Sequence, residues 1–171
     1  MKKLLLILLC LPMIGFGQQT YVPDNNFEAY LENNAMGNGI ANDDYVTTAY
    51  INTVTILNVT ALNIFDLTGI EDFTSLTTLS CGYNQLTSLD IITNTALTHL
   101  WCDNNQLTSL DVNSNINLVD LYCEFNQLTS LDVSNNTSLY DFRCSNNLLT
   151  SIDVSNNTSL YDFNLWHQVS S

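Results

Sequence analysis

Basic residues are scarce in this sequence. Three lysine and arginine residues stand against 17 aspartates and glutamates, which gives a formal net charge of −14. Two of the three, Lys2 and Lys3, lie at the N-terminus, and Arg143 is the third. Nucleic-acid-binding proteins neutralise phosphates with clustered lysine and arginine side chains, and anionic lipid surfaces attract such clusters too. The composition therefore excludes nucleic acid as a partner and disfavours an anionic membrane surface.

Long apolar runs are absent beyond the N-terminus. The run 4–14 follows two lysines and precedes a small-x-small cleavage site at residues 15–17. A membrane-spanning helix needs about 20 apolar residues, so this run is too short for one. The three features together are typical of a secretory signal peptide. We predict that residues 1–17 are removed on export and that the mature protein is secreted or lies at the cell surface, without a membrane span.

Histidine and glycine are too sparse for the common catalytic motifs. The sequence has two histidines, His99 and His167, and six glycines, with no glycine-rich phosphate loop and no convincing pair of carboxylates. Cys102 follows His99 by three residues, but on a β-strand such residues point to opposite faces and cannot form a nucleophile–base pair. We therefore predict that the protein is not an enzyme and uses no cofactor.

What the sequence does contain is an internal repeat. Blocks of 21 residues begin at Leu76, Leu97, Leu118 and Leu139, and a partial block begins at Leu160. They share the pattern L-x-x-L-x-C-x-x-N-x-L-x-x-L. Its cysteine column holds Cys81, Cys102, Cys123 and Cys144, and its asparagine column holds Asn84, Asn105, Asn126 and Asn147. Self-similarity at a fixed period is the signature of a solenoid, so we predict one coil per block.

Each block has a direct structural interpretation. Leu79 and Cys81 alternate with polar Ser80, which indicates a short strand with one buried face. Asn84 ends that strand, where its side-chain amide can satisfy backbone groups as the chain turns away. One coil buries too few side chains to fold alone, so neighbouring coils must stack. We predict a solenoid with a parallel β-sheet on its concave side and turns or short 3-10 segments on its convex side.

The segments L-x-x-L-x-C-x-x-N-Q-L-T-S-L-D-V between residues 76 and 158 resemble bacterial leucine-rich repeats of the short, internalin-like type. The preceding stretch 67–79, LTGIEDFTSLTTL, looks like the lead-in common in that family. The resemblance covers roughly residues 20–165 and implies an α/β repeat solenoid of horseshoe shape. It also implies a binding protein, because members of the family typically bind proteins or glycans at the cell surface.

The resemblance and the residue pattern divide the chain into four parts. After the signal peptide we expect an N-terminal cap at 18–50, in which the spacing of Phe27, Tyr30 and Leu31 predicts a short amphipathic helix. Residues 51–75 are interpreted as a degenerate first repeat with Ile56 inside, Val59 at the asparagine position and four extra residues. Residues 76–171 are the regular repeats. The last block is incomplete, with Leu165 replacing cysteine and Gln168 replacing asparagine, which suggests a truncated chain or a docking edge.

The cysteine column is interpreted as a ladder of buried thiols. A zinc site needs four ligands around one point, whereas these residues are expected in a straight row about 4.8 Å apart. Disulfides between neighbours are the alternative, because exported proteins meet an oxidising environment, but bonded cysteines need Cβ atoms about 3.8 Å apart. We predict no metal at this column.

Acidic residues raise the question of calcium. Asp90, Asp111, Asp132 and Asp153 form a further column, in which neighbouring charges repel by about 3.5 kcal/mol at an effective dielectric constant of 20. We expect each carboxylate to bond to the backbone of its own turn. Calcium between neighbours is the alternative. The loop 37–44, GNGIANDD, is interpreted as a polar turn, with calcium as the alternative there as well.

The concave face is the predicted binding surface. Strand alternation exposes three columns of side chains beside the buried leucines. The candidate ligand-binding residues in these columns are Tyr83, His99, Trp101, Asp120, Tyr122, Phe125, Asp141 and Arg143. Exposed aromatic side chains beside acids suit a protein or glycan partner. The predicted function is protein recognition. Glycan binding, or a structural fragment of a larger surface protein, are the alternatives.

Overall fold

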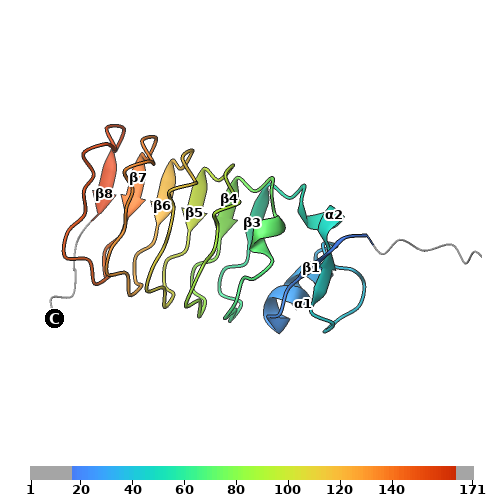
Figure 1. Cartoon of the computed structure of the whole chain (residues 1–171). Helices are drawn as coiled ribbons and strands as arrows, with labels where there is room; N and C mark the ends of the chain where they lie inside the picture. Colours follow the sequence, from blue (N-terminus) through green and yellow to red (C-terminus); the bar gives the residue numbers. More distant parts are fainter. Residues whose placement is uncertain (1–16, 165–171) are drawn as a thin grey trace, which may run out of the picture.

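The computed structural model describes residues 17–164 and shows a small N-terminal unit at one end of a row of stacked coils (Figure 1). The proposed signal peptide up to residue 16, and Leu165, His167 and Gln168, lie outside the described residues. One strand from each coil joins a six-stranded parallel sheet in chain order. The strands are β3 (Ile56–Asn58), β4 (Thr78–Ser80), β5 (His99–Trp101), β6 (Asp120–Tyr122), β7 (Asp141–Arg143) and β8 (Asp162–Asn164). This architecture confirms the predicted solenoid.

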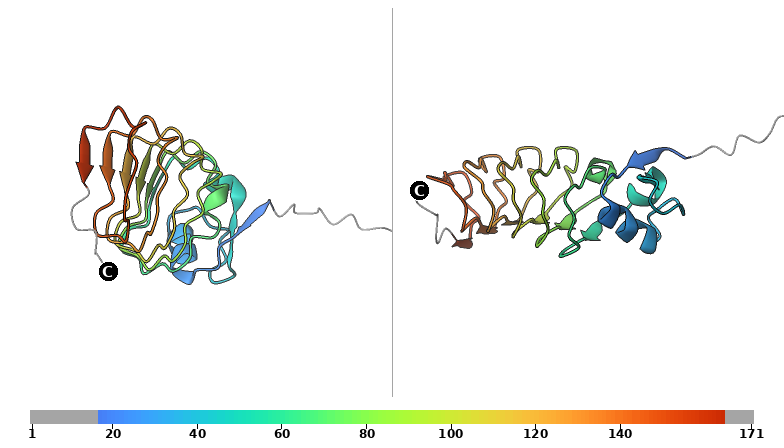
Figure 2. Two further views of the ribbon diagram at one scale, coloured as in Figure 1. Left: turned by 60° about the vertical axis from the view of Figure 1, so that its left-hand side comes forward. Right: turned by 90° about the horizontal axis from the view of Figure 1, so that it is seen from below.

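The strands pair so that equivalent residues of successive repeats lie side by side. Leu79 pairs with Leu100, Leu100 with Leu121, and Leu121 with Phe142. The opposite wall of each coil consists of turns, and η1 (Ile70–Asp72) is a 3-10 helix on the first coil (Figure 2). Because the regular repeats from β4 onward have the same length, residues at equivalent positions play the same structural role in each of these coils.

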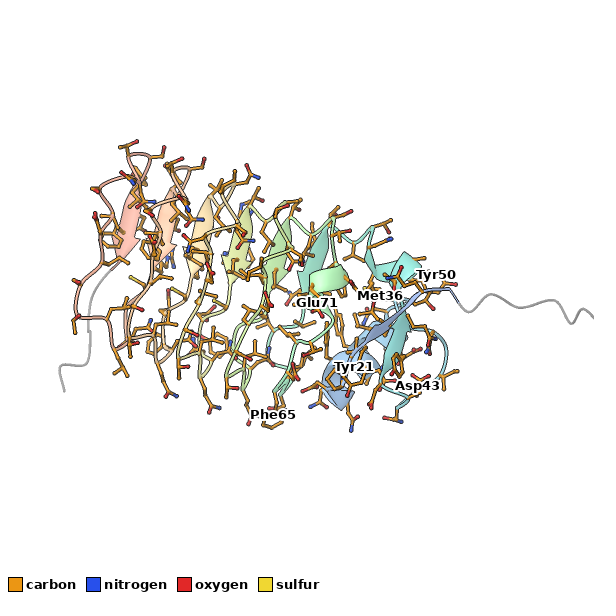
Figure 3. All side chains as sticks on the ribbon, viewed as in Figure 1. Tyr21, Met36, Asp43, Tyr50, Phe65 and Glu71 are labelled. Atoms are coloured by element: carbon orange, nitrogen blue, oxygen red, sulfur yellow. The ribbon has the colours of Figure 1, made fainter. Side chains whose placement is uncertain are left out.

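The interior of the solenoid is filled by apolar side chains between these two walls (Figure 3). The central residue of each strand is fully buried from Leu79 to Phe142. The four column cysteines are buried and form no disulfide with one another. Burial raises the pKa of Cys102 and Cys123 well above the usual value, so both remain neutral thiols that pack as small apolar groups.

The asparagine column closes the turn after each strand. The Asn126 amide nitrogen donates to the carbonyl oxygens of Cys102 and Cys123, at 3.0 and 3.1 Å, and its Oδ1 accepts the backbone N–H of Leu107 at 2.9 Å. Asn105 makes the equivalent bonds one coil earlier. Each asparagine therefore joins its own coil to the preceding one with buried hydrogen bonds.

A second buried asparagine column runs along the opposite wall and was not predicted. It consists of Asn94, Asn115, Asn136 and Asn157. The amide nitrogen of Asn136 donates to the carbonyl oxygens of Val112 and Asn115 at 3.0 and 2.9 Å. Its Oδ1 is buried and accepts no hydrogen bond from the described residues. Hydrogen bonds from one asparagine column on each side of the core thus join neighbouring coils of the solenoid.

The aspartate column lies on the surface, where each carboxylate accepts a hydrogen bond from the backbone of its own turn. Asp111 and Asp132 each accept the backbone N–H two residues later, at 2.9 Å, and Asp90 and Asp153 do the same at 3.1 and 2.8 Å. These backbone hydrogen bonds lower the pKa of Asp132 and Asp153. The predicted bonding to the turn backbone is therefore confirmed.

The N-terminal unit covers the first coil. It contains β1 (Gln19–Tyr21) antiparallel to β2 (Tyr45–Thr47), and the helices α1 (Asn25–Asn33) and α2 (Thr48–Ile51). Asp24 caps α1, because its Oδ1 accepts the N–H groups of Asn26 and Phe27, while its Oδ2 accepts that of Phe65 on the first coil at 2.7 Å. The Phe27 ring stacks on Phe73 at 6.2 Å. The predicted short helix is present and seals the apolar end of the row.

The first coil differs from its predicted register. Ile56 is 67% exposed and lies outside the core, whereas Leu57 pairs with Leu79 and is buried. Val59 consequently lies level with Cys81 and not with an asparagine, and Ile51 belongs to α2. Leu57 precedes its partner Leu79 by 22 residues, so this coil is one residue longer than a regular repeat, and the assignment of four extra residues was wrong.

The loop 37–44 is held by protein groups. The Glu32 carboxylate accepts the backbone N–H groups of Asn38 and Gly39, and the Asn38 amide donates to Asp43. Within the described residues no three histidine, cysteine, aspartate or glutamate side chains are grouped so as to hold a metal ion. No helix in the same residues is long and apolar enough to cross a membrane.

Candidate binding surface on the concave face

Two rows of side chains lie on the concave side of the sheet because the central residue of each strand points inward; their members are half-buried, except for Ser80, which is buried. The third residues of β4 to β7 form one row, and the first residues form the other. The third-residue row is Ser80, Trp101, Tyr122 and Arg143. The first-residue row is Thr78, His99, Asp120 and Asp141. Both rows match the predicted columns in register.

The third-residue row forms a continuous stack. The rings of Trp101 and Tyr122 lie 5.9 Å apart at an angle of 27°, and the guanidinium carbon of Arg143 lies 4.2 Å from the Tyr122 ring centre. Asp141 anchors the far end. It accepts Nε and Nη2 of Arg143 at 3.1 and 3.0 Å, and the Tyr122 hydroxyl donates to its Oδ2 at 2.5 Å. These bonds hold the side chains of the stack in one geometry.

Burial and the neighbouring carboxylate shift the pKa values of two members of the stack, Tyr122 and Arg143. Burial raises the pKa of Tyr122 to about 12, and its hydrogen bond to Asp141 adds to the shift. The same carboxylate raises the pKa of Arg143. Tyr122 therefore stays a neutral hydrogen-bond donor, and Arg143 stays a cation, across the physiological range.

His99 and Asp120, two further candidate residues, lie beside this stack. His99 Nε2 lies 3.4 Å from Asp120 Oδ2, and its Nδ1 lies 2.8 Å from the Thr98 hydroxyl. The imidazole meets the Trp101 ring edge-on, with ring centres 6.3 Å apart. Cys102 faces the interior, so the structure keeps the histidine and the cysteine on opposite faces, as strand alternation requires.

A hollow of about 260 Å³ opens at the Trp101 end of the stack. Its lining consists of Thr60, Ser80, Gly82, Tyr83, Trp101, Asp103 and Tyr122. Ser80 occupies the row position next to Trp101, and its short side chain cannot cover an indole ring. The structure thus brings Tyr83, Trp101 and Tyr122 together, as predicted from the columns, while Phe125 does not line this hollow.

Two carboxylates near the hollow were missed by the sequence reasoning. Asp103 lies against Gly82, where an added Cβ would come within 2.7 Å of its Oδ1. The Asn104 amide donates to the other oxygen of Asp103 at 2.9 Å. Glu124 follows Asp103 in the next coil, and burial raises its pKa, with the Asp103 charge adding to the shift. Glu124 Oε2 and Trp101 Nε1 are buried atoms that make no hydrogen bond within the described residues.

The turn beside the hollow has a left-handed backbone. Tyr83, Asn104, Phe125 and Asn146 have φ angles of 56°, 54°, 53° and 55°. Asparagine tolerates this region, whereas a bulky side chain there is strained. Tyr83 and Phe125 are nevertheless present, with 62% and 50% of their surface exposed. Core packing therefore does not explain these two aromatic residues.

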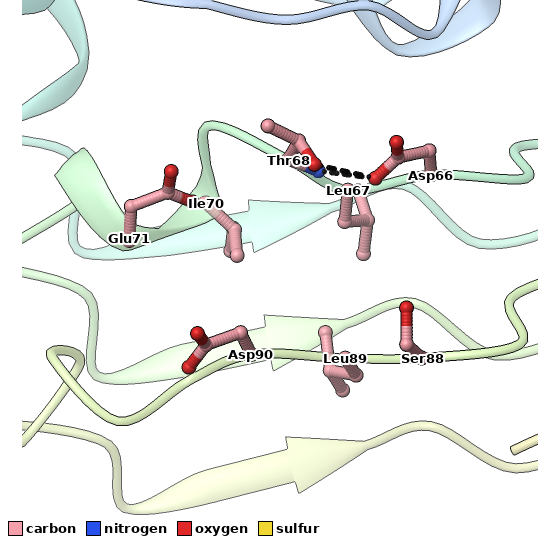
Figure 4. Close-up of a pocket in the computed structure, with 8 residues that line it drawn as sticks. All are labelled: Asp66, Leu67, Thr68, Ile70, Glu71, Ser88, Leu89 and Asp90. Atoms are coloured by element: carbon pink, nitrogen blue, oxygen red, sulfur yellow. Dashed lines mark hydrogen bonds between the residues drawn. The ribbon is translucent and has the colours of Figure 1, made fainter. Parts of the chain in front are cut away.

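A smaller hollow on the opposite wall is less suited to a ligand. It has a volume of about 130 Å³ and lies between residues 66–71 and 88–90 (Figure 4). Its carboxylates already bond to the chain, because Asp66 accepts both the N–H and the hydroxyl of Thr68, and Glu71 accepts the N–H of Gly69. The concave hollow is the candidate site.

Comparison with known proteins agrees with this architecture. A family model described as leucine-rich repeats in two copies matches residues 74–115. The structure of the functional domain of InlJ from Listeria monocytogenes, described as including a cysteine ladder, is 39% identical with a TM-score of 0.78. The match covers 89% of this chain and 34% of that one. This chain is an internalin-like leucine-rich-repeat protein.

A second internalin from the same species supports the fold assignment. InlF is 24% identical with a TM-score of 0.74, over 82% of this chain and 42% of that structure. This internalin-like chain therefore spans less than half the length of either structure. A comparison with curated protein sequences gives no match.

Proposed function

We propose that this internalin-like protein is a recognition module that binds a protein partner through its concave face. The observation that carries the proposal is the stack of Trp101, Tyr122 and Arg143, held by Asp141 and open at one end to a hollow. Tryptophan, tyrosine and arginine are the residues most often responsible for affinity at protein interfaces. On the described sheet they stand together on adjacent coils.

The stack is already ordered without a partner. The Tyr122 hydroxyl and the Arg143 guanidinium both bond to Asp141, so their side chains lose little freedom when a partner packs on them. Ordering flexible side chains costs about 0.5–1.5 kcal/mol each on association. A preformed stack avoids most of that cost, which favours recognition.

The expected location is outside the cell. The N-terminal run at 4–14 predicts export, and the family that the repeats resemble typically acts at the cell surface. The scarcity of basic residues argues against nucleic acid and anionic lipid as partners. A protein partner at the cell surface fits all three observations.

Glycan binding is a second candidate because aromatic platforms are exposed. The rings of Tyr140 and Tyr161 lie 5.2 Å apart at an angle of 6°, and Tyr161 is 80% exposed. Flat aromatic faces of this kind can stack on sugar rings. A structural role without any ligand is the third candidate.

Parallel arrays of surface proteins and of glycans separate these candidates. The mature protein is compared with a Trp101→Ala/Tyr122→Ala double variant and with Phe65→Ala, a control at an exposed residue of the first coil. We expect wild type and Phe65→Ala to bind a protein and the double variant to lose that binding. Loss of binding on the glycan array alone would favour the glycan candidate. Wild type that binds on neither array would contradict both.

A further inference from the structure

We propose that the hollow beside Trp101 receives an arginine side chain of the protein partner, which extends the existing stack by one member. The inference rests on the proposed function and names the chemical group that the surface recognises. Three observations carry it: an aromatic ring that lines the hollow, a carboxylate oxygen of Asp103 without a hydrogen bond from the described residues, and an arginine already bound to a ring and a carboxylate at the opposite end.

The stack of Trp101, Tyr122 and Arg143 ends in a bound cation on one side and in a hollow on the other. Arg143 covers the outer face of Tyr122, while the neighbour of Trp101 on the other side is Ser80. The hollow at this end has a volume of about 260 Å³. A water molecule occupies about 30 Å³ in the liquid, so a guanidinium group and its last methylene groups fit. Tyr83 provides a second wall.

The charge at the open end is negative and unbalanced. Asp103 lines the hollow, and its Oδ1 makes no hydrogen bond within the described residues, since Asn104 engages the other oxygen. Glu124 lies one coil on, outside the lining of the hollow, where the nearby charge of Arg143 acts to lower its pKa. Arg143 is the single lysine or arginine in residues 17–164 and is bonded to Asp141. A cation from outside would therefore meet the Asp103 carboxylate, one oxygen of which accepts no hydrogen bond from the described residues.

The chain shows how such a cation is held. The guanidinium carbon of Arg143 lies 4.2 Å from the Tyr122 ring centre, and a carboxylate two residues before Arg143 accepts two of its N–H groups. An arginine in the hollow would find the Trp101 ring and the Asp103 carboxylate in the corresponding roles. Tryptophan binds a cation over its face more strongly than tyrosine does.

Arginine fits this site better than the other candidates. Its planar group can stack on an indole and donate in plane to a carboxylate, whereas a lysine ammonium is a compact charge that can do only one at a time. A neutral sugar would stack on Trp101 but would leave the carboxylates without a counter-charge. The site therefore favours a protein partner with an exposed arginine.

Titration with small probes tests the inference. Labelled mature protein is followed by the indole N–H resonance of Trp101, assigned with Trp101→Phe. The probes are N-acetyl-arginine amide, its neutral isostere N-acetyl-citrulline amide, N-acetyl-lysine amide and methyl β-glucoside. We expect saturable binding of the arginine probe with a dissociation constant on the order of 1 mM. We expect at least tenfold weaker binding of citrulline and weaker binding of lysine. Equal binding of citrulline, tighter binding of the glucoside, or no saturable shift would overturn the inference.

Two variants locate the bound probe. Ser80→Tyr fills the open row position with another ring, and Asp103→Asn removes the charge while keeping the shape. Each is expected to weaken the arginine probe at least fivefold, while Asp132→Asn, the same change on an exposed turn, leaves binding unchanged. Circular dichroism checks folding, and Asp103→Asn decides the outcome if Ser80→Tyr does not fold. Unchanged binding by Asp103→Asn would contradict the inference.

The array experiment keeps this inference distinct from the proposed function. If the arginine probe does not bind but the protein array still depends on Trp101 and Tyr122, the arginine inference is wrong and the proposed function stands. If the probe binds the hollow and the array shows no protein partner, the proposed function is contradicted, and with it the role assigned to the bound arginine.

Discussion

Replacement of Asn126 by alanine is expected to destabilise the solenoid more than replacement of any surface asparagine. Asn126 lies in a central coil and is buried. Its amide nitrogen donates to the carbonyl oxygens of Cys102 and Cys123 and makes a longer contact of 3.4 Å with that of Glu124. Its Oδ1 is the acceptor for the N–H of Leu107, a fully buried residue. Asn126→Ala removes all of these bonds and leaves nothing in their place.

The size of this destabilisation depends on which hydrogen bonds remain to each partner of Asn126 after the substitution. The carbonyl oxygens of Cys102 and Cys123 each retain one asparagine donor, Asn105 and Asn147 respectively. Loss of their hydrogen bonds to Asn126 therefore costs about 1 kcal/mol per bond. The N–H of Leu107 loses its acceptor and is left buried and unpaired, which costs about 1–3 kcal/mol. We therefore expect Asn126→Ala to lower the free energy of unfolding by about 3–5 kcal/mol in all.

Asn136 provides a matched comparison on the opposite wall. Its amide nitrogen also bonds to two carbonyl oxygens, but these oxygens retain the backbone donors Asn115 N–H and Leu118 N–H. Its Oδ1 accepts nothing from the described residues, so no N–H is orphaned by its removal. Asn136→Ala is therefore expected to cost about 2 kcal/mol, clearly less than Asn126→Ala.

Urea unfolding followed by circular dichroism measures both variants. The slope of free energy against urea should stay at its wild-type value, because the surface exposed on unfolding is unchanged. Gln127→Ala, at an exposed side chain beside Asn126, serves as the control and should lie within about 0.5 kcal/mol of wild type. Equal costs for Asn126→Ala and Asn136→Ala would refute the argument from the orphaned N–H.

Three further predictions concern other parts of the chain. Burial raises the pKa of Glu28 above 4.5, so its charged form disfavours folding, and that penalty appears as pH rises through the raised value. Glu28→Gln should therefore unfold at higher urea than wild type at pH 7, with the gap closing below pH 4.5, and a gap independent of pH would contradict this. Tyr83→Asn removes a bulky side chain from a left-handed backbone position and should raise the free energy of unfolding by about 0.5–1 kcal/mol. The same change should weaken partner binding. A variant that is less stable than wild type would contradict the strain assigned to Tyr83. Because burial raises the pKa of the Cys102 thiol, iodoacetamide should label it only in unfolded protein, as peptide mass spectrometry can show.

The fold was predictable because a single period fixes it. With blocks of equal length, pairing of one leucine with the next also aligns the cysteine and asparagine columns. Within each block, the alternation of buried and polar residues marks the strand, and the residues after the alternation stops form the turns of the opposite wall. No interaction between distant parts of the chain was needed to infer these features, since every coil contacts only its neighbours.

The first coil was misread because its register is set by a neighbour. Apolar residues at 54, 56, 57, 59 and 62 permit more than one alignment with the repeat. The structure selects the one in which Asn84, on the next coil, accepts the N–H groups of Leu62 and Ile64 at 3.0 and 3.1 Å. That interaction joins residues 20 or more positions apart. It is not visible in the spacing of the first coil alone.

The candidate site was only partly predictable. Its aromatic members follow from strand alternation, but the hollow depends on Gly82 and Asp103, which share a column with Glu124 and Ser145. A column that changes from glycine to acid to serine carries no repeat signal. The second asparagine ladder is the opposite case, because Asn94, Asn115, Asn136 and Asn157 recur every 21 residues and could have been predicted from that period.

This contrast separates residues that build the coil from residues that serve its surface. Columns with one residue type throughout, such as the cysteines and asparagines, satisfy a need that every coil repeats. The left-handed turn also imposes the same need on every coil, and Asn104 and Asn146 meet it. Tyr83 and Phe125 occupy that turn against the preference of its backbone and stay exposed. Stability does not account for a strained, exposed aromatic residue, so we infer that it contributes through contacts made outside the chain, and Tyr83 lines the hollow where we propose them.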